Sequence, residues 1–169
     1  MFLADFPQAS GDFRVLDAGS FRIGHPAGWQ VYQSGSAVTL APQGGLVQSG
    51  QATGLAYGAM ISLYEPQSDD LGRVSLNQAT SELIEDLRHS NPGLRVIGRQ
   101  RLELDGRAAR SATMRGMSPV RGEPEIDWLV TTMRPDGRLL YIVFVAPERD
   151  FTSYRPVFVR MLESVQLAR

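Results

Sequence analysis

The feature that most constrains the fold is an uninterrupted apolar run, Leu139–Val145, that follows a turn signal. Such a run is typical of a strand covered on both faces, because a strand with one solvated face alternates apolar and polar residues. Pro135-Asp136-Gly137 separates it from Glu125–Met133, a second strand-like segment, and this arrangement predicts a hairpin. The chain therefore needs a sheet with a central strand and a covering layer on each side.

A second hairpin is predicted at Asp105-Gly106, a dipeptide suited to the positive φ angles of a type I′ turn. Leu94–Leu104 and Arg107–Arg115 flank it as the two strands. Counting outward from a two-residue loop pairs Leu104 with Arg107 and, further out, Arg101 with Arg110. The turn thus predicts a register as well as a hairpin.

The N-terminal half predicts further strands. We expect strands at residues 21–23, Trp29–Gln33 and Ala37–Ala41, and an alternating strand over residues 55–63. Pro42–Thr53 is rich in glycine and glutamine and is expected to be a long loop. Residues 1–20 show no periodicity and are expected to be a linker or lead-in, so that one domain spans residues 21–169.

Two segments have helical patterns. Ser75 and Gln78 have the spacing of a capping box, and Asn91-Pro92-Gly93 must end the helix that follows. A second apolar stripe lies near the C-terminus, where Pro156 is tolerated if Thr152 or Ser153 is the N-cap. We expect an α+β fold, an α/β/α sandwich in which two main helices cover a central twisted antiparallel sheet.

Composition narrows the function classes. The 169 residues contain no cysteine, which excludes thiolate catalysis and disulfide frameworks, and the net charge of −1 argues against a nucleic-acid partner. No apolar stretch has bilayer-spanning length, so direct membrane insertion is not expected, and Met1–Ser20 lacks the pattern of a secretory signal. The oligomeric state stays open.

No catalytic or metal-binding constellation is present. The only histidines are His25 and His89, and the zinc-peptidase, nucleophile-elbow and phosphate-loop motifs are absent. The carboxylate pairs at residues 69–70 and at Glu123 and Glu125 lie in segments expected to be solvated. We therefore expect no catalytic residue, no metal ligand, no cofactor, and no enzyme activity of this chain itself.

Arginine density between Arg95 and Arg121 is the most unusual local feature, in a chain whose 17 basic residues are all arginine. The predicted register sets Arg101 opposite Arg110, with Arg99 on the same face, an unfavourable arrangement unless an anion or acid intervenes. One interpretation is a patch that binds an anion or an acidic partner. The other, which we favour, is a solvated outer face.

Four aromatic residues are candidates for a ligand pocket: Trp29, Tyr57, Trp128 and Tyr141. Each also falls on a predicted strand, where core packing is the more common role.

The strand order, with Phe21-Arg22-Ile23 and His25-Pro26-Ala27-Gly28-Trp29 opening the sheet and Val38–Pro42 following, resembles the PsbP-like superfamily. That superfamily also includes DcrB-type envelope lipoproteins and Ran-binding Mog proteins. The resemblance implies an α/β/α sandwich and transfers no function.

A closer resemblance covers nearly the whole folded part. Asn91–Val96, Asp127–Val130, Arg134–Gly137, Val145–Phe151 and Arg160–Leu162 resemble the C-terminal extension of bacterial HtpX/BepA-like zinc metallopeptidases. The peptidase motif itself is absent, so no catalytic residue carries over. This resemblance implies an extracytoplasmic setting, in the periplasm or envelope, and a connection with a longer protease.

Two hypotheses follow from these observations. The first is a non-catalytic accessory domain that binds a protein or peptide and works with an envelope metallopeptidase. The second is a stand-alone module that binds a small ligand or lipid, or acts as a chaperone-like adaptor. An enzyme ranks third.

Overall fold

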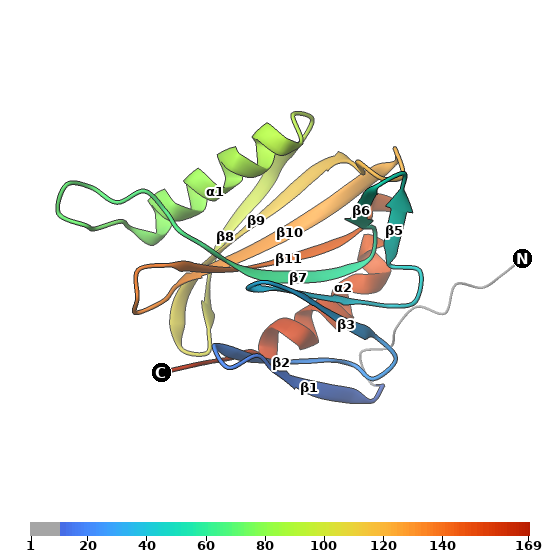
Figure 1. Ribbon diagram of the computed structural model, residues 1–169, viewed down its shortest axis with the longest axis horizontal. Coiled ribbons are helices and arrows are strands. Elements are labelled where there is room, and N and C mark those ends of the chain that lie inside the picture. The colour runs from blue at the N-terminus through green and yellow to red at the C-terminus, as the bar shows by residue number, and fades with distance from the viewer. Residues whose placement is uncertain (1–10) are drawn as a thin grey trace, which may run out of the picture.

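The computed structural model describes residues 11–169, and Figure 1 shows the course of the chain. Two helices are present in this part, α1 (Leu76–Ser90) and α2 (Glu148–Glu163). The strands are β1 (Phe13–Asp17), β2 (Phe21–Pro26), β3 (Gln30–Ser34), β4 (Ala37–Ala41), β5 (Leu46–Ser49), β6 (Ala52–Leu55), β7 (Gly58–Tyr64), β8 (Arg95–Leu104), β9 (Arg107–Met117), β10 (Pro124–Met133), β11 (Leu139–Pro147) and β12 (Gln166–Leu167).

A seven-stranded sheet in the order β3-β4-β7-β11-β10-β9-β8 dominates the architecture. Every neighbouring pair in it is antiparallel. The predicted apolar strand is β11, and it lies in the middle of the sheet between β7 and β10. Two smaller assemblies, β1-β2-β12 and the β5-β6 hairpin, complete the strand arrangement.

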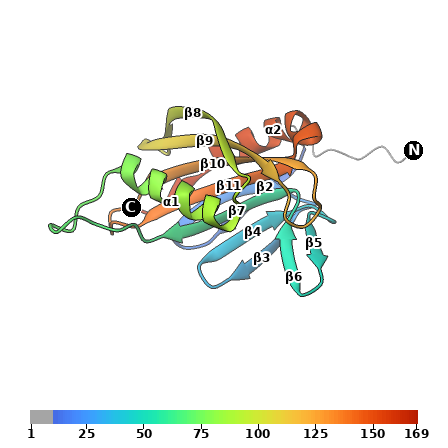
Figure 2. The ribbon, with the colours of Figure 1, turned by 90° about the horizontal axis from the view of Figure 1, so that it is seen from above.

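The large sheet is covered on both faces. Helix α1 lies over one face, while α2 and the β1-β2-β12 sheet lie on the other, as Figures 1 and 2 show. This arrangement confirms the predicted α+β class with a central antiparallel sheet between two helices. Neither helix has the length and apolar character that crossing a bilayer needs.

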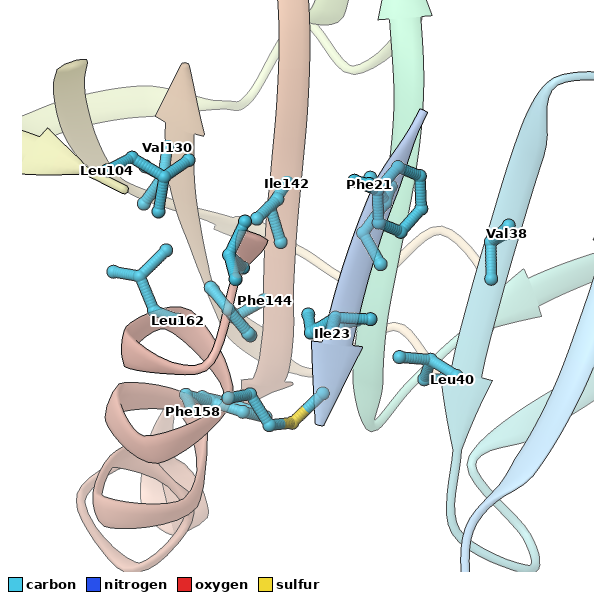
Figure 3. Packing of buried hydrophobic residues seen from close by; sticks show 14 of the residues in the cluster. Phe21, Ile23, Val38, Leu40, Leu104, Val130, Ile142, Phe144, Phe158 and Leu162 are labelled. Carbon is cyan, nitrogen blue, oxygen red and sulfur yellow. The ribbon is translucent and has the colours of Figure 1, made fainter. Parts of the chain in front are cut away.

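Two apolar cores fill the spaces on either side of the sheet. The larger core joins the sheet to α2 and β2, and Figure 3 shows Phe144 of β11 and Phe158 of α2 close together, with Ile23 of β2 beside them. The ring centroids of Phe144 and Phe158 lie 5.0 Å apart. The smaller core joins the other face to α1 through residues that include Leu83, Ile84 and Leu129.

The turn chemistry of the β8-β9 hairpin is as predicted. Asp105 and Gly106 have φ angles of 49° and 77°, the doubly positive conformation of a type I′ turn. Leu104 pairs with Arg107 and Arg101 pairs with Arg110, which confirms the predicted register. The β10-β11 hairpin is confirmed as well, with Met133 opposite Leu139.

Helix α1 begins as the sequence predicts. The Ser75 hydroxyl accepts a hydrogen bond from the backbone N–H of Gln78 at 3.1 Å, and the Gln78 side chain accepts one from the Ser75 N–H at 3.0 Å. This is the reciprocal pair of a capping box. The helix ends at Ser90, directly before Asn91-Pro92-Gly93.

Two expectations about the N-terminal half need correction. Part of the expected lead-in forms strand β1, which pairs with β2, so the folded part begins before Phe21; residues 1–10 lie outside the described part. The expected loop at Pro42–Thr53 contains β5 and much of β6, which form a hairpin. Both strands are short, and their mix of glycine and polar residues hides the period-two pattern.

The strand expected over residues 55–63 divides in two. Leu55 ends β6 and packs with the α1 core, while Tyr57, Leu63 and the residues between them on the same face pack toward α2. Gly58 allows the bend with a φ of 135°, and a Cβ there would lie 2.3 Å from the Leu40 carbonyl oxygen. No residue with a side chain fits this position without strain.

Helix α2 begins earlier than predicted. Its N-cap is Pro147 rather than Thr152 or Ser153, and Pro156 lies inside the helix. Glu148 and Asp150 in the first turn favour this start, because carboxylates stabilise the positive end of the helix dipole. Packing of the helix on the sheet outweighs the backbone hydrogen bond that Pro156 removes.

Candidate functional site

An open cavity of about 340 Å³ lies between α1 and the outer strands β8 and β9. Every residue that lines it has a polar or charged side chain, and three of them are arginines. The residues are Asn77, Thr80 and Ser81 from α1, Arg99, Gln100 and Arg101 from β8, and Arg110 and Ser111 from β9. The structure thus brings together all three arginines that sequence reasoning singled out as an anion or acidic-partner patch. We call this the arginine cavity.

The hairpin register places these side chains. Because the two-residue turn sets Arg101 opposite Arg110, both side chains lie on one face of the sheet. That face is the one covered by α1, since the Arg110 Nε donates to Asn77 Oδ1 at 2.7 Å. Arg99, two residues before Arg101, lies on the same face.

The three arginines differ in how they are held. Arg110 is anchored at both ends of its guanidinium, by Asn77 and by the Ala109 carbonyl oxygen at 2.9 Å. Arg99 and Arg101 make no hydrogen bond or ion pair with any residue between 11 and 169. The cavity lining contains no carboxylate. The two guanidinium groups are therefore free of an ion-pair partner within residues 11–169, and an incoming carboxylate or phosphate would gain charge-assisted hydrogen bonds.

A buried hydroxyl pair holds the wall of the cavity in place. Thr80 of α1 and Thr131 of β10 share a hydrogen bond of 2.7 Å between their Oγ1 atoms, and both residues are buried. The Thr80 hydroxyl also donates to the Leu76 carbonyl oxygen at 2.7 Å. This link fixes the distance between α1 and the sheet beside the arginines.

A pair of buried carboxyls was not predicted. Glu125, expected to be solvated, is only 4% exposed, and the adjacent carboxyl of Asp127 has a buried Oδ1. Burial, together with the charge of the neighbouring Glu125, raises the pKa of Asp127 to about 8. Burial also raises the pKa of Glu125, against a hydrogen bond from Ser118 that lowers it. The pair therefore holds a proton at neutral pH.

Between residues 11 and 169, no group of three histidine, aspartate or glutamate side chains is placed to hold a metal ion. The carboxyl atoms Glu125 Oε2 and Asp127 Oδ1 have no hydrogen-bond partner. Alternation along β10 places the pair on the α1 face, where strand pairing sets Asp127 beside the apolar Met114 and Val145.

A compensated charge network lies at the start of α2. Arg149 contacts Glu123 at 2.7 Å, and Arg121 contacts the other oxygen of Glu123 at 3.1 Å. The Tyr57 hydroxyl donates to Asp150 Oδ2 at 3.0 Å. Because each acid here has a basic or hydroxyl partner, the network ties the chain together and leaves no free charge for a ligand.

The four candidate pocket aromatics are not brought together. Trp29, Tyr57 and Trp128 belong to the α2 core: Trp29 meets Phe158 edge-on, and Trp128 lies 5.2 Å from Phe144 between ring centroids. Tyr141 packs on the opposite face, with the α1 core. Their placement is that of core residues rather than of one pocket lining.

No protein-family model matches this chain, and no curated protein matches it in sequence. Solved structures do match it. Cyanobacterial PsbP (CyanoP) from Synechocystis sp. PCC 6803 is 11% identical, with a TM-score of 0.66 and 94% of each chain covered. The Ran-binding protein Mog1p from Saccharomyces cerevisiae is 9% identical, with a TM-score of 0.62, over 94% of this chain and 96% of that one.

A third similar structure is LpqN, a protein involved in cell envelope biogenesis of Mycobacterium tuberculosis. It is 15% identical, with a TM-score of 0.55, over 94% of this chain and 91% of that one. At such identities a structural likeness establishes the fold and not the activity. The fold of this chain is thus the PsbP-like α+β fold, as the sequence resemblance predicted.

Proposed function

We propose that this chain is a non-catalytic binding module whose ligand is an acidic segment of a protein or peptide partner. One observation carries the proposal: Arg99 and Arg101 face an open cavity beside the anchored Arg110, and neither forms an ion pair with a residue between 11 and 169. Guanidinium groups bind carboxylates in a planar, two-pronged geometry, which favours such a partner. Use of the fold by Mog1p, a Ran-binding protein, supports a protein ligand.

The setting we propose is extracytoplasmic, in association with an envelope zinc metallopeptidase. The sequence resemblance to the C-terminal extension of such enzymes supports the association, and the similarity to LpqN, a protein of cell envelope biogenesis, supports the compartment. Co-purification from envelope extract tests it: a tagged chain should recover a protein with a His-Glu-x-x-His motif. Recovery of no such protein would remove the metallopeptidase part of the proposal.

A titration tests the binding proposal itself. A fluorescently labelled threonine peptide with glutamate at only two positions, separated by one residue, is titrated against the wild-type chain and the Arg101→Ala, Arg110→Ala double variant. Hydrogen bonds to charged groups contribute roughly 1.5–3 kcal/mol each, so the double variant should bind at least about tenfold more weakly. Inorganic phosphate in a parallel titration separates a small-anion site from a peptide site.

The matched control removes two arginines from the other side of the molecule. Arg14 of β1 and Arg155 of α2 are both exposed, so the Arg14→Ala, Arg155→Ala variant loses the same net charge. It should bind the peptide within about twofold of wild type, since only long-range charge is lost. Equal weakening in both double variants would refute a specific arginine site.

A further inference from the structure

Strand β8 is one end of the seven-stranded sheet, and its outer edge has no partner strand among residues 11–169. Figures 1 and 2 show it at the margin of the sheet. An unpaired edge presents a row of backbone N–H and C=O groups that can pair with another chain. The arginine cavity lies directly beside this edge.

The turn geometry determines which backbone groups of β8 face outward. The two-residue loop makes Leu104 and Arg107 a hydrogen-bonded pair, and such pairs alternate along an antiparallel ladder. Leu102 and Gln100 therefore direct their backbone groups toward β9. Arg99, Arg101 and Glu103 direct theirs to the outside.

The same three residues present their side chains to the α1 face. The residues of β8 that can pair through the backbone are therefore the ones whose side chains line the α1 face. A residue of an added strand directly opposite Arg101 would contact both the outward backbone groups of Arg101 and its guanidinium group. The regular stretch ends at a bulge between Val96 and Gly98, where Ile97 is unpaired and 59% exposed. A segment of about five residues, opposite Arg99–Glu103, fits this edge.

We propose that an extended acidic segment of the partner adds to β8 as an antiparallel strand, with acidic side chains opposite Arg99 and Arg101 and a basic or neutral one opposite Glu103. This inference rests on the proposed function and specifies how the partner binds. Antiparallel addition follows because every pairing in this sheet is antiparallel. The positive charges of Arg99 and Arg101 favour an acidic segment as the added strand.

The opposite end of the sheet lacks these features. Strand β3 has five residues, Gln30–Ser34, none of which is charged. Like β8, it has no partner strand on its outer side within the described part of the chain, so it offers backbone groups without the arginines. Strand β3 therefore serves as an internal control for edge pairing that does not depend on charge.

Two N-methylated peptides test the inference. In the first, the two glutamates of the peptide carry the N-methyl groups; in the second, the threonines adjacent to the glutamates carry them. Antiparallel addition needs the N–H groups of the residues opposite Arg99 and Arg101, so methylation at the glutamates should weaken binding at least tenfold. Methylation at these threonines, whose N–H groups point away from β8, should change affinity less than threefold.

Amide hydrogen exchange provides a readout in the unmodified protein. Without peptide, the amides of Gln100 and Leu102 should exchange slowly and those of Arg99, Arg101 and Glu103 quickly. Saturating peptide should slow the second group at least tenfold and leave the amides of β3 unchanged. A Glu103→Pro variant, compared with Glu103→Ala, removes one outward N–H and should bind more weakly than the alanine variant.

The outcomes separate this inference from the proposed function. If both methylated peptides bind like the parent while Arg101→Ala, Arg110→Ala weakens binding, the acidic segment binds by charge without forming a strand, and the inference is wrong. If the arginine variant binds the parent peptide like wild type, the proposed function fails with it. If saturating peptide slowed hydrogen exchange at the β3 amides instead of the β8 amides, the peptide would add to β3, and the inference would be wrong.

Discussion

The buried carboxyls of Glu125 and Asp127 should make the stability of this protein depend on pH in an unusual direction. A buried acid with a raised pKa binds its proton more tightly in the folded than in the unfolded chain. Its contribution to stability is complete below the ordinary carboxyl pKa and is lost as the pH rises through the folded pKa. The protein should therefore be more stable at pH 5.5 than at pH 7.5.

The size of the effect follows from the number of protons involved. Burial raises the pKa of Asp127 to about 8, so between about pH 4 and pH 8 the native chain holds one proton more than the unfolded chain. One proton corresponds to about 1.4 kcal/mol per pH unit. From pH 5.5 to 7.5 the free energy of unfolding should fall by roughly 3 kcal/mol on this account.

Urea unfolding, followed by tryptophan fluorescence at half-unit steps of pH, measures this slope. The Glu125→Gln, Asp127→Asn double variant removes both ionisable groups. The difference in free energy of unfolding between this variant and wild type should therefore change by roughly 3 kcal/mol between pH 5.5 and pH 7.5. Subtracting the two profiles cancels every other titrating group. An Asp70→Asn, Glu163→Gln variant, which changes two exposed carboxyls, should retain the wild-type slope. Parallel profiles for wild type and the buried-pair variant would refute the reasoning.

Three further substitutions test the fold by the same urea assay. Ser75→Ala removes the capping box of α1 and should lower the free energy of unfolding by about 1 kcal/mol, whereas Ser68→Ala in the exposed loop should change it by less than about 0.5 kcal/mol. Gly58→Ala forces a Cβ against the Leu40 carbonyl oxygen and should cost at least about 2 kcal/mol. Phe158→Ala leaves a cavity under α2 and should cost about 3–5 kcal/mol. Losses half as large would contradict the packing described.

Local chemistry made much of the fold predictable. A doubly positive turn accepts few residue pairs, so Asp105-Gly106 determined both the hairpin and its register. Leu139–Val145 has the length and the continuous apolar character of a strand shielded on two sides, and Ser75 with Gln78 set the start of α1. In each case the constraint acts within a few neighbouring residues and does not depend on contacts with distant parts of the chain.

The mispredicted elements depend on distant contacts. Strand β1 is stabilised by pairing with β2 and by packing of Phe13 and Leu16 on the core, and neither is visible in its own composition. The start of α2 was placed too late because a proline usually marks a helix beginning, yet Pro156 is held inside by the surrounding packing.

The site was predictable to a similar extent. Register arithmetic predicted that Arg101 and Arg110 would face each other, but the cavity around them depends on where α1 crosses the sheet. The sequence pattern of Glu125 and Asp127 is that of a solvated edge. Their burial depends on the strands that pair with β10, which set Asp127 beside Met114 and Val145, and no local pattern predicts these neighbours.

The β1-β2-β12 sheet joins the first and last strands of the described chain, and this has a consequence for folding during synthesis. Phe21 and Ile23 belong to a core that α2 and β12 complete, and these two elements leave the ribosome after all the other described elements. Until α2 and β12 have been synthesised, the apolar face of β2 therefore stays exposed to solvent. A nascent chain stopped before α2 should bind chaperones, and synthesis of α2 and β12 should end that binding.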